Sequence, residues 1–304
     1  MLSTLADAFV VHPGAAAVLS VGLSAAGVAV LLRCHRAVAG TTLAAPLVWA
    51  LGCLAAVAGV ETAAAWSQAH APAWLAYARY LAAATTLAPS MALLGARRPQ
   101  DKAWQFIVLS LIVVLWLPVG SGWALGASRL PELHAAWSWF LLALIGVGLI
   151  NHLPTRYCLA SGLVAAGQLC LLSDQLPFGL PPQGPWRPLL GLACLVLAIV
   201  LAARAARRRP AVVRPLDRLW HDFRDAFGLL WAARVAERFN ASAAMYDWPV
   251  RLGWGGLKAS PTGDEAAPSP AEADPRLRTM ETNLKSLLRR FASPAWIARR
   301  LEQV

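Results

Sequence analysis

Charged residues are scarce in this chain. They make up only 14% of its 304 residues, whereas hydrophobic residues make up 58%. Soluble domains carry about 25% charged residues. The deficit lies in one part of the chain: residues 1–203 hold nine Lys or Arg and five Asp or Glu, whereas residues 204–304 hold eighteen and eleven. The sequence therefore divides into a membrane part and a charged tail.

Sequence signatures of soluble enzymes are also missing. The chain has no Walker loop, no GxGxxG, GxSxG or HExxH motif and no kinase motif set. Its five cysteines show neither CxxC nor metal-ligand spacing, so we interpret them as small apolar residues. We therefore predict no catalytic residues and no metal site, and we favour a non-catalytic role.

The net charge of +11 is not accompanied by a basic stripe with interleaved aromatic residues, so nucleic acid is not an expected partner. Much of the charge lies at helix ends, where lipid headgroups explain it. The first expected partner is therefore the lipid bilayer itself.

Long apolar runs dominate the first 203 residues. A membrane helix needs about 20 apolar residues, and seven segments meet or approach that length. The sixth is short and contains Gln168, and the seventh is also short. We therefore predict an all-α, polytopic membrane helix bundle over residues 1–203. The seven expected spans are Gly14–Leu32, Pro46–Ser67, Trp74–Gly95, Trp104–Trp123, Leu133–Asn151, Tyr157–Ser173 and Pro188–Ala203.

The distribution of positive charge sets the expected orientation. Ten Lys or Arg follow the odd-numbered spans, and only Arg129 and Arg187 lie on the opposite side. Because cytoplasmic loops carry the excess of Lys and Arg, the N-terminus is expected outside and the tail in the cytoplasm. Compact loops and an Ala/Arg-rich composition indicate a bacterial inner membrane. The alternative is five spans, with spans five and six forming a re-entrant pair around residues 152–156.

Two charges lie inside the expected second and third spans, which is costly in a bilayer. Glu61 lies about ten residues before the turn between these spans and Arg79 about seven after it, so their depths differ by roughly 4–5 Å. We therefore expect an intramembrane ion pair. It either locks the hairpin or lines a path for a ligand or proton. In a third alternative, Arg79 only extends outward to the interface.

Two histidines, His70 and His134, fall at the outer ends of spans. Imidazole is a usual axial ligand of haem, so the pair is a candidate haem site. The chain has no CxxCH motif, and the Trp-rich haem-binding loop of haem-handling membrane proteins is also missing. Plain polar caps are the alternative, and no cofactor is predicted.

The tail is expected to contain three parts. Residues 204–257 form a juxtamembrane amphipathic helix and an ordered Trp/Gly-rich loop, residues 258–275 a disordered linker, and residues 276–304 two amphipathic helices. Short amphipathic helices cannot bury their apolar faces alone. The bundle, a second copy or another protein is expected to cover them. The residues expected to dock on a partner or on the membrane surface are Leu216, Trp220, Phe223, Phe227, Leu284, Leu288, Phe291 and Trp296.

These features favour a non-catalytic membrane subunit or scaffold that engages a partner through its helical tail. Two other functions stay open on the sequence alone. One is a seven-span sensor or small-molecule transporter with a polar site around Glu61 and Arg79, and the other is a haem-handling protein that uses His70 and His134.

Overall fold

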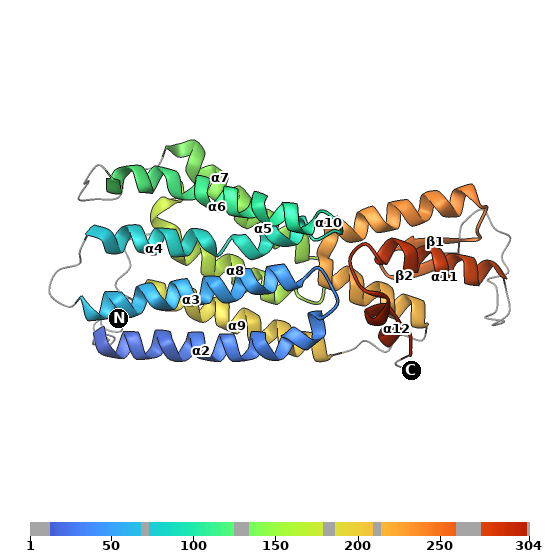
Figure 1. Ribbon diagram of the computed structural model, residues 1–304, viewed down its shortest axis with the longest axis horizontal. Helices are drawn as coiled ribbons and strands as arrows, with labels where there is room; N and C mark the ends of the chain where they lie inside the picture. Colours follow the sequence, from blue (N-terminus) through green and yellow to red (C-terminus); the bar gives the residue numbers. More distant parts are fainter. Residues whose placement is uncertain are drawn as a thin grey trace.

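Antiparallel apolar helices form one half of the molecule, and the tail forms the other half at one end of these helices (Figure 1). This arrangement comes from a computed structural model, which describes residues 13–67, 73–124, 134–178, 186–208, 214–259 and 275–302. The bundle helices are α2 (Pro13–Val38), α3 (Ala44–Trp66), α4 (Ala73–Thr85), α5 (Ala88–Leu94), α6 (Asp101–Ala124), α7 (Ala135–His152), α8 (Cys158–Leu171) and α9 (Arg187–Arg207).

Five of these helices, α2, α3, α6, α7 and α9, are long and apolar enough to cross a membrane. They also turn large apolar side chains outward: Val18, Phe106, Leu117 and Ile150 are all at least half exposed. Such side chains are suited to lipid rather than water. The chain is thus mostly helical and compatible with a multi-pass membrane protein.

The expected third span is broken into α4 and α5 at Thr86 and Leu87. Pro89 has no N–H and so cannot bond the Thr85 carbonyl one turn earlier. The Cys53 thiol donates to that carbonyl instead (2.8 Å), and Gln168 Nε2 donates to the Thr86 carbonyl (2.8 Å). Gln168, the polar residue of the expected sixth span, therefore reaches from α8 and satisfies a backbone carbonyl at the break.

Helix α8 has 14 residues and is followed by a short 3-10 turn, η1 (Ser173–Gln175). At 1.5 Å per residue it is about 21 Å long, shorter than the hydrocarbon core of a bilayer. Length alone therefore supports five spans and does not decide on the two further ones.

The tail contains α10 (Pro215–Met245), α11 (Pro275–Leu288), α12 (Pro294–Glu302) and one β-hairpin. The hairpin, β1 (Val250–Gly253) paired with β2 (Gly256–Ala259), replaces the expected ordered loop, so the fold is not strictly all-α. Asn240 of α10 holds it, because its side chain bonds both the N–H (2.7 Å) and the carbonyl (3.0 Å) of Leu252. Most of the expected linker, residues 260–274, lies outside the described residues.

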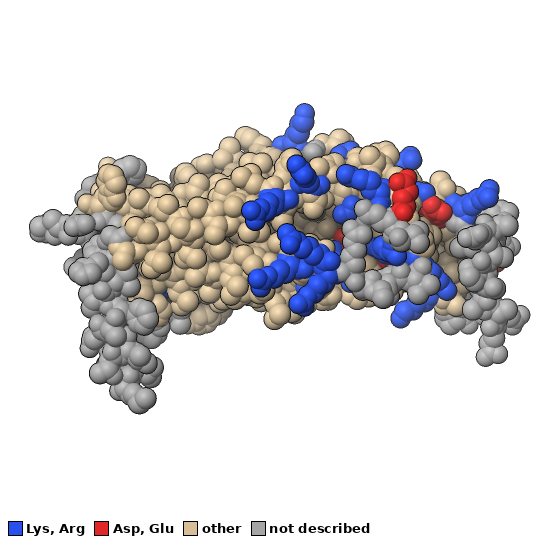
Figure 2. All heavy atoms as spheres, turned by 90° about the horizontal axis from the view of Figure 1, so that it is seen from below, with Lys and Arg blue, Asp and Glu red and all other residues tan. Residues whose placement is uncertain are grey.

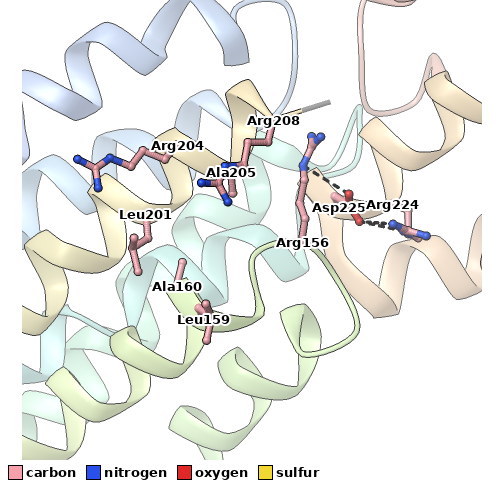
Figure 3. Close-up of a pocket in the computed structure, with 9 residues that line it drawn as sticks. All are labelled: Arg156, Leu159, Ala160, Leu201, Arg204, Ala205, Arg208, Arg224 and Asp225. Atoms are coloured by element: carbon pink, nitrogen blue, oxygen red, sulfur yellow. Dashed lines mark hydrogen bonds and ion pairs between the residues drawn. The ribbon is translucent and has the colours of Figure 1, made fainter. Parts of the chain in front are cut away.

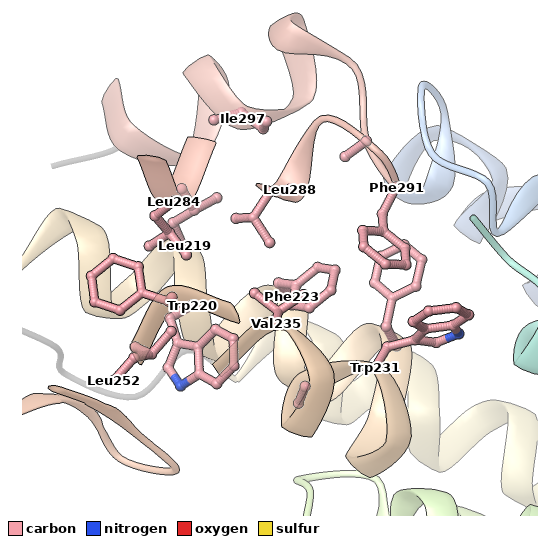
Figure 4. Packing of buried hydrophobic residues seen from close by; sticks show 14 of the residues in the cluster. Leu219, Trp220, Phe223, Trp231, Val235, Leu252, Leu284, Leu288, Phe291 and Ile297 are labelled. Carbon is pink, nitrogen blue, oxygen red and sulfur yellow. The ribbon is translucent and has the colours of Figure 1, made fainter. Parts of the chain in front are cut away.

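One hydrophobic core joins α10, α11, α12 and the hairpin (Figure 4). Phe223, Phe227 and Trp231 pack against Phe291, with ring centroids 5.0–5.3 Å apart. The residues that the sequence assigns to docking lie in or against this core. Leu216 is partly buried, and the other seven are at most 3% exposed: Trp220, Phe223, Phe227, Leu284, Leu288, Phe291 and Trp296. The helices cover one another's faces, together with Leu93 and Ala96 at the end of the bundle.

Candidate functional site

Glu61 of α3 and Arg79 of α4 lie together. Arg79 donates from Nε to Glu61 Oε1 (2.8 Å) and from its terminal nitrogen to Oε2 (2.7 Å). This two-pronged geometry is the one that guanidinium and carboxylate groups favour. The Glu61 side chain is 11% exposed and that of Arg79 is 39% exposed. The pair therefore closes the α3–α4 hairpin while one face of Arg79 stays accessible.

Replacing Glu61 or Arg79 with glutamine should lower the thermal stability of the protein in detergent, because each change leaves the partner's charge unpaired. The double variant should lose less than the sum of the single losses, with a coupling of about 0.5–3 kcal/mol. The measurement is the apparent melting temperature of all four proteins in one detergent. Additive losses would show that the two side chains do not interact.

Of the two histidines of the candidate haem site, only His134 lies among the described residues. His134 is exposed and caps α7, where its Nδ1 accepts a hydrogen bond from Ala136 N (3.2 Å), whereas His70 lies outside the described residues. Among the described residues, no group of three or more His, Cys, Asp or Glu is placed to hold a metal ion.

The α11–α12 turn is held by two loops at one end of the bundle. Ser293 N donates to the Gly40 carbonyl (2.7 Å), Thr42 N donates to the Phe291 carbonyl (3.0 Å), and Arg98 N donates to the Arg290 carbonyl (2.8 Å). Thr41 and Ala292 form an antiparallel β-bridge. These backbone bonds attach the C-terminal helices to the α2–α3 and α5–α6 loops.

A third attachment lies where α10 bends. Gly228 has a positive φ of 78° and interrupts the helix, which leaves backbone groups of the neighbouring turns without helical partners. Asn151, at the end of α7, satisfies two of them: Oδ1 accepts from Leu230 N (3.1 Å), and Nδ2 donates to the Phe227 carbonyl (3.4 Å). The buried Asn151 side chain thus joins the bundle to the tail.

Beside this bend, charges from both halves form a cluster. Asp225 is 2% exposed. It accepts from Arg224 Nε (2.9 Å) and lies 3.4 Å from Arg156 Nε of the α7–α8 loop. Asp222 bonds Arg156 (3.1 Å) and Arg300 of α12 (3.1 Å). The two carboxylates therefore tie the α7–α8 loop to both ends of the tail.

The protonation states of this cluster suit ion pairing. Burial alone would lower the pKa of Arg156, but Tyr157, Asp222 and Asp225 outweigh it and raise that pKa. Burial raises the pKa of the Tyr157 hydroxyl, and the Arg156 cation only partly offsets this. Arg156 therefore stays charged and Tyr157 stays neutral at physiological pH.

A pocket of about 640 Å³ opens beside this cluster, between α8, α9 and α10 (Figure 3). Four arginines line it: two are held by Asp225, and two lie at the end of α9. Arg204, in the last turn of α9, and Arg208, its C-cap residue, are exposed and make no ion pair within the described part of the chain. Leu159 and Leu201 supply apolar walls. The pocket is therefore basic on one side and apolar on the other.

Further positive side chains lie at this level of the molecule. On the face in Figure 2, Lys and Arg gather where the apolar bundle meets the tail. Burial, followed by the cations of Arg290, Arg238 and Arg234, lowers the pKa of Arg97. Like charges are thus close together here, an arrangement that anionic lipid headgroups favour.

Sequence reasoning missed the pocket and the buried carboxylate. Asp222, Arg224 and Asp225 take polar positions of the amphipathic helix expected within residues 204–257, and Arg156, Arg204 and Arg208 are among the ten cations that orient the spans. No local pattern signals this burial: residues two apart on a helix do not share a face, so Phe223 and Phe227 place Asp225 on the opposite side of α10. In comparisons of the chain with protein-family models, curated proteins and solved structures, no significant match was found.

Proposed function

We propose that the protein is a non-catalytic subunit or scaffold of a bacterial inner membrane, whose membrane bundle holds a folded cytoplasmic domain against the membrane surface. The tail domain, defined as residues 214–302, is the part that engages a partner. The observation that carries this proposal is the attachment of the tail domain to three separate loops of the bundle. Such an anchorage fixes both the position and the orientation of the domain.

The buried docking residues change where a partner would bind. Because the apolar helix faces form the core of the tail domain, a partner has to use its outer surface. Met245 and Tyr246, at the end of α10 away from the bundle, are 76% and 60% exposed (Figure 1). Exposed large apolar side chains next to each other are candidates for a protein contact. This end of α10 is therefore the place to test.

The test is co-purification after gentle detergent extraction, with a tag at the N-terminus. We expect a stoichiometric partner that is lost in the variant Met245→Asp/Tyr246→Asp. The control variant Ser286→Asp adds a charge at another exposed position of the tail domain and should retain the partner. A solitary protein in all samples would refute the scaffold proposal, and retention of the partner in both variants would refute the proposed surface.

We further propose seven membrane crossings, with the N-terminus outside and the tail domain in the cytoplasm. The broken α4–α5 segment and α8 would supply the two crossings beyond the five long helices. Supporting this, every loop that contacts the tail domain belongs to the Lys- and Arg-rich side.

Labelling of single introduced cysteines in intact cells tests this topology, in a variant without the five native cysteines. Cysteines at Ser67, His134 and Phe178 should react with a membrane-impermeant maleimide, and cysteines at Gln100 and Pro154 should not. Protection at Phe178 or labelling at Pro154 would contradict the crossing by α8.

A sensor or small-molecule transporter is the second candidate, because Arg79 stays 39% exposed beside its buried partner. A ligand with a carboxylate or phosphate could reach this guanidinium. Ligand binding that is lost in Arg79→Gln but kept in Arg187→Gln, a change at another outer arginine, would favour this candidate.

A further inference from the structure

The pocket between α8, α9 and α10 has the chemistry of a site for one specific class of ligand. Its positive charge that is not ion-paired within the described residues comes from Arg204, in the last turn of α9, and Arg208, the C-cap residue whose N–H bonds the Arg204 carbonyl. Guanidinium groups bind phosphate oxygens through paired hydrogen bonds. Asp225 is the one acidic group among the nine lining residues, and Arg224 and Arg156 already neutralise it.

The other wall of the pocket is apolar and faces outward. Leu159 lines the pocket and is 76% exposed, and Leu201 lies on α9 one turn before Ala205. Both helices belong to the apolar bundle, so this wall continues into the surface that faces lipid. A small soluble anion would use the arginines and leave the leucines uncovered. A lipid would use both walls.

We propose that this pocket binds the phosphate headgroup of an anionic phospholipid from the cytoplasmic leaflet, with the acyl chain leaving past Leu159 and Leu201. The arginines bind the phosphate, and the leucines contact the glycerol and the first methylenes. Helix α10 of the tail domain lines one side of the pocket, and α8 and α9 of the bundle line the other sides. A bound lipid therefore contacts both halves and strengthens their attachment.

The geometry also assigns a role to Arg156. Its Nε is buried and makes no hydrogen bond within the described part of the chain, although Asp225 lies at ion-pair distance. A phosphate oxygen in the pocket would give this cation a third anionic neighbour, beside Asp222 and Asp225. Lipid binding should then slow hydrogen exchange at residues 222–230 of α10, where Asp225 and the bend at Gly228 lie.

The test is native mass spectrometry of the full chain, released from nanodiscs of phosphatidylcholine with 20% phosphatidylglycerol added as the probe. We expect one phosphatidylglycerol to stay bound. The double variant Arg204→Gln/Arg208→Gln should weaken this binding about 30-fold, because each arginine near an anionic headgroup contributes about fivefold to the affinity. The matched control is Arg33→Gln/Arg36→Gln, which removes two exposed arginines from the same end of α2 and should retain the lipid.

A second variant separates the pocket from charge alone. Ala205→Phe keeps every arginine but fills the space between α8 and α9, so it should also lose the lipid. Retention of the lipid in Ala205→Phe, or equal loss in both double variants, would show only a diffuse attraction and overturn the proposal. Displacement of the lipid by millimolar inorganic phosphate would assign the site to a soluble anion and equally overturn it. The partner experiment above does not depend on this result.

Discussion

Replacing Gly228 with alanine is expected to release the tail domain from the bundle. The glycine has φ 78° and ψ −175°, a conformation nearly restricted to glycine. It costs other residues about 1–3 kcal/mol. A Cβ there would also lie 2.6 Å from both Asn151 Cγ and the Asn151 carbonyl oxygen. Moving packed atoms typically costs a further 1–3 kcal/mol or so. Both costs fall on the contact between Gly228 and Asn151, so the attachment of α10 to α7 should fail.

Hydrogen–deuterium exchange of the detergent-solubilised protein measures this effect. In Gly228→Ala, exchange in α10 should accelerate by more than tenfold, while exchange in α2 and α9 stays unchanged. The control is Gly255→Ala in the hairpin turn, where an added Cβ meets no atom within 4 Å. Equal exchange in the two variants would show that the bend is not under the constraint inferred here.

Replacing Asp225 with alanine is expected to be nearly as harmful. Its carboxylate is the buried anion shared by Arg224 and Arg156, whose side chains are only 13% and 19% exposed. Removing one partner of a buried ion pair costs about 3–5 kcal/mol, because it leaves uncompensated charge. The apparent melting temperature of the tail domain should fall. It can be measured as the temperature at which a cysteine introduced at the buried position Ala243 becomes reactive toward a thiol reagent.

The matched control for this prediction lies at the opposite end of the bundle. Asp174 pairs with Arg187, but its side chain is 61% exposed, and surface ion pairs contribute at most about 1 kcal/mol. Asp174→Ala should therefore leave the melting temperature nearly unchanged. A drop in Asp225→Ala no larger than that in Asp174→Ala would mean that the buried cluster does not stabilise the attachment.

The helical segments were predictable because their signal is local. Runs of apolar residues locate α2, α3, α6, α7 and α9, and Ser293–Pro294 marks the start of α12, where Ser293 Oγ accepts from Trp296 N (3.3 Å). The proximity of Glu61 and Arg79 also follows from residue counting along two antiparallel helices. A bilayer imposes these regularities, since it restricts both the length and the direction of each span.

The packing of the tail could not be predicted in the same way. Helical periodicity identifies which residues are buried but not what buries them. From the sequence alone, the surface that covers Trp220 and Leu288 could therefore not be named. The junction depends on contacts between residues far apart in sequence, such as Asn151 with Phe227 and Leu230. The hairpin is likewise held by a contact between separate segments: the Asn240 side chain bonds the backbone of Leu252, and nothing in the sequence around Leu252 indicates this contact.

The most direct test of the attached tail domain is a disulfide between Thr41→Cys and Ala292→Cys. These residues form the antiparallel bridge between the α2–α3 loop and the α11–α12 turn, and directly opposed residues place their Cβ atoms about 4.5–5.5 Å apart. The variant would lack the native cysteines and carry a protease site within residues 260–274. After mild oxidation in native membranes and cleavage, the C-terminal fragment should stay joined to the bundle until reductant is added.

The control pair is Thr41→Cys with Arg278→Cys, because Arg278 lies ten residues, or about 15 Å, before the end of α11. We expect efficient cross-linking of the first pair and little of the second. A fragment that separates in both cases, or that cross-links equally in both, would contradict a tail domain held against the bundle and would favour amphipathic helices lying free on the membrane surface.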